Sequence, residues 1–240
     1  MPEGGNSEAL IRLDALTRRL RSECPWDREQ DERSIVAHTV EEAYELADAA
    51  HERQDAKLLD ELGDVLFQVH FLALLLEERG AGDLAQVAEH CSQKLIRRHP
   101  HVFAEVEVAD ADEVLRNWDQ IKRREPGRER GVFGEVPENL PALLYARKIQ
   151  RRAACAGECA EDAPELSLAA LRGKLDQLCA VLDEESPEGP SAGESARPEA
   201  FHQLGELLFV VVALARGLKL DPELALRAAA HRFREKIGEG

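Results

Sequence analysis

Apolar residues recur at the three- and four-residue spacing of an α-helix along almost the whole length of this chain. Almost no segment alternates polar and apolar residues with the two-residue period of a β-strand. This pattern predicts an all-α fold. Prolines, glycines and capping residues divide the pattern into nine expected helices, at about 7–22, 34–52, 56–79, 82–98, 110–124, 140–154, 164–184, 199–217 and 221–236.

Two segments interrupt the helical pattern. Residues 125–139 mix proline, glycine and charged residues, which is typical of a linker between domains. Residues 185–198 are rich in proline, serine, glycine and glutamate, and we expect a flexible loop there. The sequence ELGDVLFQVHFLA at 61–73 returns as QLGELLFVVVALA at 203–215. We therefore expect two related helical domains, residues 1–124 and 140–240.

Composition and charge limit the classes of partner and the location. Hydrophobic residues make up 44% of the chain, which is typical of a globular protein. The net charge is −16, and this acidity argues against a nucleic-acid polymer as partner, because polyphosphate backbones are bound by clustered Lys and Arg. No uninterrupted apolar run approaches the roughly 20 residues of a membrane span, and no signal peptide is recognisable.

The cysteines favour a reducing compartment. Five scattered cysteines make a disulfide framework improbable, so we expect a cytoplasmic protein. Cys155 and Cys159 could form half of a zinc site, but no second pair at ligand spacing follows. A structural thiol pair is the favoured interpretation of these two residues.

Two groups of acidic residues suggest a metal site. Residues 41–45 read EEAYE and residues 61–64 read ELGD, so Glu42 and Glu45, like Glu61 and Asp64, lie three residues apart on one helix face. A short break near residues 52–56 allows the second helix to return alongside the first. An antiparallel pair would bring the four carboxylates together.

The second acidic pair lies in an apolar context that a solvated helix face would lack. Crowded carboxylates repel one another, and a hard divalent cation such as Mg²⁺ relieves this repulsion. Mg²⁺ also bridges substrate phosphates and activates water. Acidic pairs of this spacing are common on solvated helices, and that remains the alternative. The combination of both acidic pairs with the apolar context of the second pair favours metal binding.

These acidic motifs resemble the signature of the MazG family of nucleoside triphosphate pyrophosphohydrolases. EExxE corresponds to Glu41, Glu42 and Glu45, and ExxD to Glu61 and Asp64. Three further segments are similar to family motifs: CPWD at 24–27, the run KLIRRHPHVF at 94–103, and WDQIK at 118–122. The resemblance extends from about residue 10 to the C-terminus and is strongest up to residue 155.

The resemblance implies an all-α fold of tandem MazG-like helical-bundle units, usually as a homodimer. It implies hydrolysis of (d)NTPs between the α- and β-phosphates, giving a nucleoside monophosphate and pyrophosphate. It also implies Mg²⁺, with Mn²⁺ as an alternative ion, as the cofactor. The metal ligands would be Glu42, Glu45, Glu61 and Asp64, with Glu41 as a general-base candidate.

The same resemblance suggests residues that contact the nucleotide. Lys94, Arg98 and Lys122 would bind the phosphates, and Trp118 would lie against the nucleotide. Each of the pairs Lys94/Arg98 and Trp118/Lys122 has the four-residue spacing that places two groups on one helix face. Taken alone, Lys94 and Arg98 also fit solvated surface charges, and Trp118 a core residue.

The second half has lost most of the acidic motif. Gln203 and Glu206 stand where the first half has Glu61 and Asp64, and residues 173–177 read GKLDQ where a second EExxE would lie. A glutamine supplies no anionic oxygen, and a lysine repels a metal ion. We therefore expect residues 140–240 to be a degenerate, non-catalytic domain that serves packing or dimerisation.

Two alternatives remain at the level of function. One is a more specialised pyrophosphohydrolase on the same scaffold, acting on dUTP or phosphoribosyl-ATP; the CPWD and RRHPHVF segments favour MazG over it. The other is a non-catalytic helical module that binds nucleotides or a partner protein. The intact ligand set of the first half weighs against that module.

Overall fold

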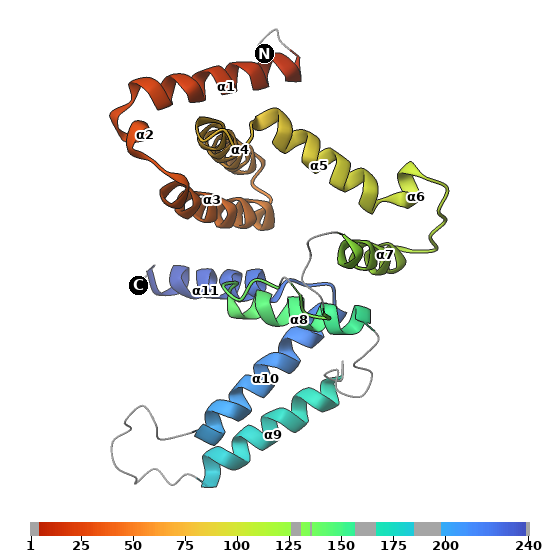
Figure 1. Cartoon of the computed structure of the whole chain (residues 1–240). Coiled ribbons are helices and arrows are strands. Elements are labelled where there is room, and N and C mark those ends of the chain that lie inside the picture. The colour runs from red at the N-terminus through yellow and green to blue at the C-terminus, as the bar shows by residue number, and fades with distance from the viewer. Residues whose placement is uncertain (1–4, 126–130, 135, 157–166, 185–197, 239–240) are drawn as a thin grey trace. The chain divides into compact units, whose positions relative to one another are not determined.

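In the computed structural model, the described residues 5–125, 131–134, 136–156, 167–184 and 198–238 form eleven helices and no strand (Figure 1). The all-α prediction is therefore confirmed. The helices are α1 (Asn6–Glu23), α2 (Pro25–Glu29), α3 (Glu32–Glu52), α4 (Asp55–Glu78), α5 (Leu84–Arg98), α6 (Pro100–Phe103), α7 (Ala111–Arg124), α8 (Ala142–Ala156), α9 (Leu168–Glu184), α10 (Pro198–Gly217) and α11 (Pro222–Gly238).

Nine of these helices match the nine expected ranges to within a few residues. The short helices α2 and α6, which each begin at a proline, were not expected. Most of the expected loop at 185–198 falls outside the described residues, as do parts of the linker and Cys159. The described parts of the linker, 131–134 and 136–139, contain no helix.

Local capping fixes where α3 and α5 begin. The Asp31 carboxylate accepts hydrogen bonds from the backbone N–H groups of Arg33 and Ser34, and the Ser34 hydroxyl accepts one from the Asp31 N–H. Asp83 and Gln86 form the same reciprocal arrangement at the start of α5. Such caps satisfy backbone donors that have no partner inside the helix and are worth about 1 kcal/mol each.

The chain divides into two compact units, Met1–Glu107 and Val108–Gly240. Helices α1 to α6 belong to the first unit, and α7 to α11 to the second. The helix expected at residues 110–124 was placed in the first domain, whereas the structure groups α7 with the second unit. In the second unit, α7 contacts α8, and Arg151 of α8 lies 3.5 Å from the almost fully buried carboxylate of Asp119 on α7.

The first unit is built on the pair α3 and α4, which pack side by side. Arg53, in the left-handed region at φ 56°, ends α3 and allows α4 to start two residues later. Helix α1 packs against α4, where Arg18 and Arg21 form ion pairs with Glu77 and Glu78. The core between α3 and α4 contains Ile35, Phe71 and Leu75, with Phe67 and Leu72 packed against them.

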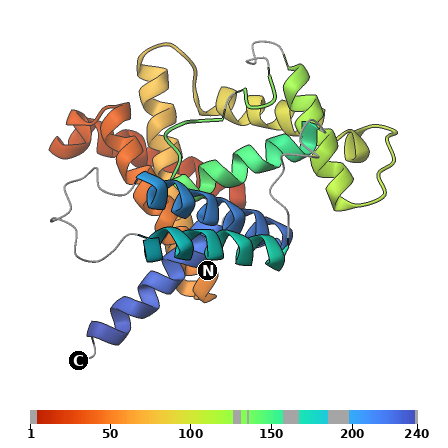
Figure 2. The same ribbon diagram turned by 90° about the horizontal axis from the view of Figure 1, so that it is seen from below.

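The second unit repeats this plan. Helices α9 and α10 lie side by side in both views (Figures 1 and 2), and α8 packs on α10 as α1 packs on α4. The Gln150 amide of α8 donates to the Phe209 carbonyl of α10, and Arg147 pairs with Asp221 at the start of α11. Buried Val210, Val212 and Ala213 form the apolar side of α10.

Both units expose an apolar stripe on the second helix of the pair. The two stripes occupy equivalent positions of the internal repeat: Leu59, Leu62, Leu66 and Val69 on α4, and Phe201, Leu204, Leu208 and Val211 on α10. Among the described helices, α10 alone is long and apolar enough by composition to cross a membrane, a criterion that core helices of soluble proteins also meet.

Candidate metal centre

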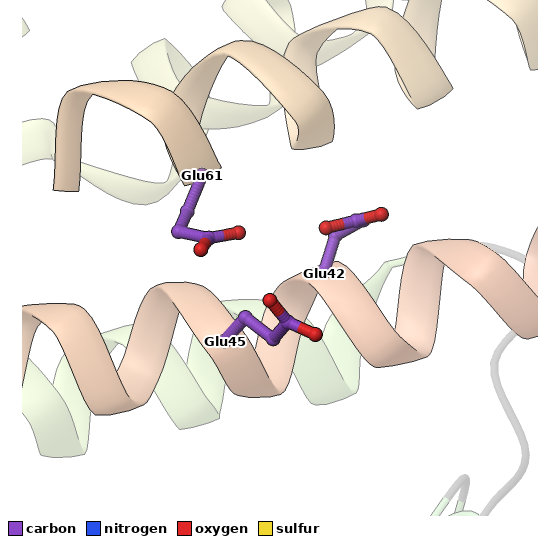
Figure 3. A group of neighbouring side chains, drawn as sticks. All are labelled: Glu42, Glu45 and Glu61. Atoms are coloured by element: carbon purple, nitrogen blue, oxygen red, sulfur yellow. The ribbon is translucent and has the colours of Figure 1, made fainter. Parts of the chain in front are cut away.

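Three carboxylates converge between α3 and α4. Glu42 and Glu45 come from α3 and Glu61 from α4, and one carboxylate oxygen of each lies within 4.8 Å of the others. Figure 3 shows the two α3 side chains and the α4 side chain directed into the same space. The convergence expected from the sequence is therefore present for these three residues.

The helix pair explains this arrangement. Glu42 and Glu45 are three residues apart, so both point toward the helix that returns alongside. The tight connection after Arg53 sets the register that brings Glu61 opposite them. Glu61 is only 6% exposed, Glu42 is half-buried and Glu45 is exposed, so the cluster has an enclosed side and an open side.

Burial and mutual repulsion raise the pKa of two members of the cluster. The pKa of Glu42 lies above its ordinary value because of burial first, and then because of the negative charges of Asp64 and Glu45. The pKa of Glu61 is raised by burial and by Glu45, against the opposing positive charge of Lys57. A group of carboxylates whose charged forms are disfavoured is the environment that a divalent cation relieves.

Asp64 and Glu41 stand at the margin of the cluster. Asp64 follows Glu61 by one turn of α4 and is exposed; its carboxylate is not one of the three that converge, but its charge acts on Glu42. Glu41 is exposed and its Oε2 lies 3.2 Å from His38 Nδ1. The role of Asp64 as a ligand and that of Glu41 as a base remain predictions.

The cationic residues expected at the substrate lie on two different helices. Lys94 and Arg98 are on α5 of the first unit, where Lys94 is half-buried and Arg98 is 6% exposed. Trp118 and Lys122 are on α7 of the second unit, and both are half-buried. The structure therefore gives Arg98 more burial than a solvated surface charge would have.

Comparison with known proteins identifies the family. Residues 30–103, which include the whole acidic motif as well as Lys94 and Arg98, match the family described as MazG nucleotide pyrophosphohydrolase domain. The chain is 37% identical over 236 residues to the nucleoside triphosphate pyrophosphohydrolase of Escherichia coli strain K12, covering 96% of this chain and 86% of the relative.

The chain belongs to the MazG family.

Further relatives agree with this membership. A Thermotoga maritima protein named nucleoside triphosphate pyrophosphohydrolase/pyrophosphatase MazG is 37% identical over 228 residues, covering 94% of this chain and 82% of the relative. A nucleoside triphosphate pyrophosphohydrolase of Mycobacterium tuberculosis is 34% identical over 158 residues, covering 65% of this chain and 48% of the relative.

The structure shows contacts of residues near the MazG motif that were not predicted from the sequence. Lys57, one turn before Glu61, supplies a positive charge beside the cluster, and its four-residue spacing was the available signal. Asp27 of the CPWD segment is buried, and its backbone carbonyl accepts a hydrogen bond from Arg21. His99, at the C-terminal end of α5, donates from Nδ1 to the Leu95 carbonyl at 2.6 Å.

Two pockets in the described residues lie away from the cluster. One of about 360 Å³ in the first unit is lined mainly by Arg18, Arg21, Arg28 and Glu78. One of about 290 Å³ in the second unit is lined by Leu140, Leu144, Arg147, Lys148 and Arg151. Neither pocket is lined by a carboxylate of the cluster.

Proposed function

We propose that this MazG family protein hydrolyses (d)NTPs to (d)NMPs and pyrophosphate in a Mg²⁺-dependent reaction, by water attack at the α-phosphate in its first unit. The observation that carries the proposal is the convergence of Glu42, Glu45 and Glu61 with raised pKa values of Glu42 and Glu61. The names of the E. coli and T. maritima relatives support the same reaction class.

The chemistry of the donor set fits Mg²⁺. All three converging groups are carboxylates, whose hard oxygens Mg²⁺ prefers. The positive charge of a bound ion would offset their mutual repulsion. Glu42, Glu45 and Glu61 would hold the ion together with Asp64, and Mn²⁺ would substitute for Mg²⁺. A bound ion of this kind polarises a phosphoryl oxygen and lowers the pKa of water.

The remaining functional residues would orient the triphosphate. Lys94 and Arg98 present two cationic groups on one side of α5, and they would offset the charge of the leaving pyrophosphate. Glu41, one residue before the first ligand, would accept a proton from the attacking water, and its contact with His38 would hold it in place.

We also propose a cytoplasmic homodimer. The exposed stripe of Leu59, Leu62, Leu66 and Val69 on α4 supports the dimer, because a contiguous apolar helix face is stabilised by a second copy. Gly63 lies within this stripe, and no atom would lie within 4 Å of a Cβ placed there, so another backbone can approach closely. The net charge of −16 supports a small nucleotide as partner in place of a nucleic-acid polymer.

A product assay tests the proposed reaction. The purified protein is incubated with each (d)NTP and Mg²⁺, and nucleoside monophosphate, pyrophosphate and orthophosphate are quantified separately. We expect monophosphate and pyrophosphate in equal amounts, loss of turnover when EDTA is present, and recovery when excess Mn²⁺ is added. Stepwise release of orthophosphate, or turnover that persists in EDTA, would contradict the proposal.

A further inference from the structure

The pair α9 and α10 contains the positions that correspond to the metal centre of the first unit. The repeat of 61–73 at 203–215 places Gln203 at the position of Glu61 and Glu206 at that of Asp64. On α9, the GKLDQ segment puts Lys174 at the position of Glu42 and Gln177 at that of Glu45. These four residues therefore define a second, altered centre.

An ion pair joins the two helices at this altered centre. Lys174 Nζ of α9 lies 3.3 Å from Glu206 Oε2 of α10, and the two side chains are 31% and 41% exposed. The corresponding residues of the first unit are Glu42 and Asp64, whose like charges repel: the Asp64 charge contributes to raising the pKa of Glu42. One substitution thus turns a repulsive contact between helices into an attractive one.

The other two positions have lost their charge. Gln203 donates from Nε2 to Glu199 Oε1 at 2.7 Å, while its Oε1 is shielded from solvent and accepts no hydrogen bond from the residues that the structure describes. Gln177 is likewise neutral. The altered centre therefore carries one carboxylate and one ammonium, where the first unit carries four carboxylates, and it needs no further positive charge.

We propose that the Lys174 ammonium takes the place of the metal ion in the second unit, so that α9 and α10 pack without a divalent cation. The inference rests on the proposed metal role of the first unit, because it assigns Lys174 by correspondence with Glu42. An ion pair this exposed contributes little to stability, because solvent screens the attraction between the two charges. The ion pair matters because it balances the charge of the altered centre. The second unit can therefore serve as a scaffold that needs no metal ion.

Metal-binding capacity tests this assignment on the full chain. The triple variant Lys174→Glu, Gln177→Glu, Gln203→Glu, with Glu206 retained, restores four carboxylates to the second unit. Mn²⁺ titration with electron paramagnetic resonance detection of the free ion should show a capacity roughly twofold that of the wild type. Adding Glu61→Gln to the triple variant should abolish Mn²⁺ binding in the first unit and leave Mn²⁺ binding at the restored centre of the second unit. An unchanged capacity in a triple variant with wild-type helicity would overturn the proposal.

Two single variants keep the test informative if the triple variant does not fold. Lys174→Glu places two carboxylates in contact, so its Tm in EDTA should fall and should recover partly with Mn²⁺. Lys174→Met, of similar length and neutral, should lose less and should not respond to Mn²⁺ beyond the wild type. Equal Mn²⁺ responses of the two variants would contradict the assignment. Absence of Mn²⁺ binding to the wild type would instead refute the proposed function, while the Lys174→Glu response would still report on the second unit.

Discussion

Glu61 is the most buried residue of the cluster, and it faces the negative charge of Glu45 on the neighbouring helix. Both features disfavour the ionised form of Glu61. Its neighbour Lys57 offsets only part of this cost, since the pKa of Glu61 stays above its ordinary value of 4.5. The folded state thus holds a proton on Glu61 more readily than the unfolded chain does. Without a metal ion, this carboxylate favours folding when protonated and opposes it when ionised.

Metal-free stability should therefore depend on pH through Glu42 and Glu61. Because both pKa values are raised, their stabilising contribution is present below pH 4.5 and is lost as pH rises through the folded-state values. We expect Glu61→Gln in EDTA to melt at a higher temperature than the wild type at pH 7, and the difference to vanish below pH 4.5.

Thermal denaturation followed by circular dichroism across this pH range measures the effect. Glu105→Gln is the matched control, because Glu105 is exposed and lies in the segment between α6 and α7. Its melting temperature should follow that of the wild type at every pH. A Glu61→Gln variant that melts with the wild type throughout would show that Glu61 is not electrostatically strained.

At the scale of elements, the sequence predicted what depends on local pattern and missed what depends on distant contacts. The long amphipathic helices such as α4 and α10 were predictable, because their apolar spacing persists over many turns. Helices α2 and α6 are too short for a periodic pattern. The grouping of α7 with the second unit depends on tertiary contacts such as that of Asp119 with Arg151, which spacing alone does not reveal.

The same distinction applies within the candidate site. Convergence of Glu42, Glu45 and Glu61 followed from three-residue spacing and a tight reversal, both visible in the sequence. The position of Asp64 at the margin depends on side-chain placement and helix rotation, which periodicity defines only to about a residue. Burial of Arg98 similarly required the packed structure.

The exposed stripe on α4 leads to a prediction about assembly. The double variant Leu62→Glu, Leu66→Glu should weaken the homodimer by at least about 100-fold, because burying each leucine is worth about 1.5–3 kcal/mol. Sedimentation velocity at micromolar protein should show monomer for this variant and dimer for the wild type.

Ile11→Glu supplies the control for that experiment. Ile11 is an exposed apolar residue on α1, outside the α4 stripe, so its variant should remain dimeric. Dimers that persist in the double variant, or a wild type that is monomeric at the same concentration, would contradict the proposed interface.

At the scale of the whole molecule, one helical plan occurs twice with opposite electrostatic outcomes. The first unit gathers carboxylates between α3 and α4, and the second unit joins α9 to α10 through Lys174 and Glu206. The segment that matches the MazG nucleotide pyrophosphohydrolase domain, residues 30–103, also lies in the first unit. The proposed division of labour is therefore a catalytic first unit, which also carries the proposed dimer stripe, and a second unit that serves as a metal-independent scaffold.

Comparing equivalent variants in the two units tests this division most directly. Pyrophosphate release from (d)NTPs with Mg²⁺ is measured for Glu61→Gln in the first unit and for Gln203→Ala at the equivalent position of the second. Loss of an anionic ligand should reduce turnover by at least about 100-fold in Glu61→Gln, while Gln203→Ala should retain roughly wild-type turnover. An active Glu61→Gln variant together with an inactive Gln203→Ala variant would contradict the assignment of catalysis to the first unit.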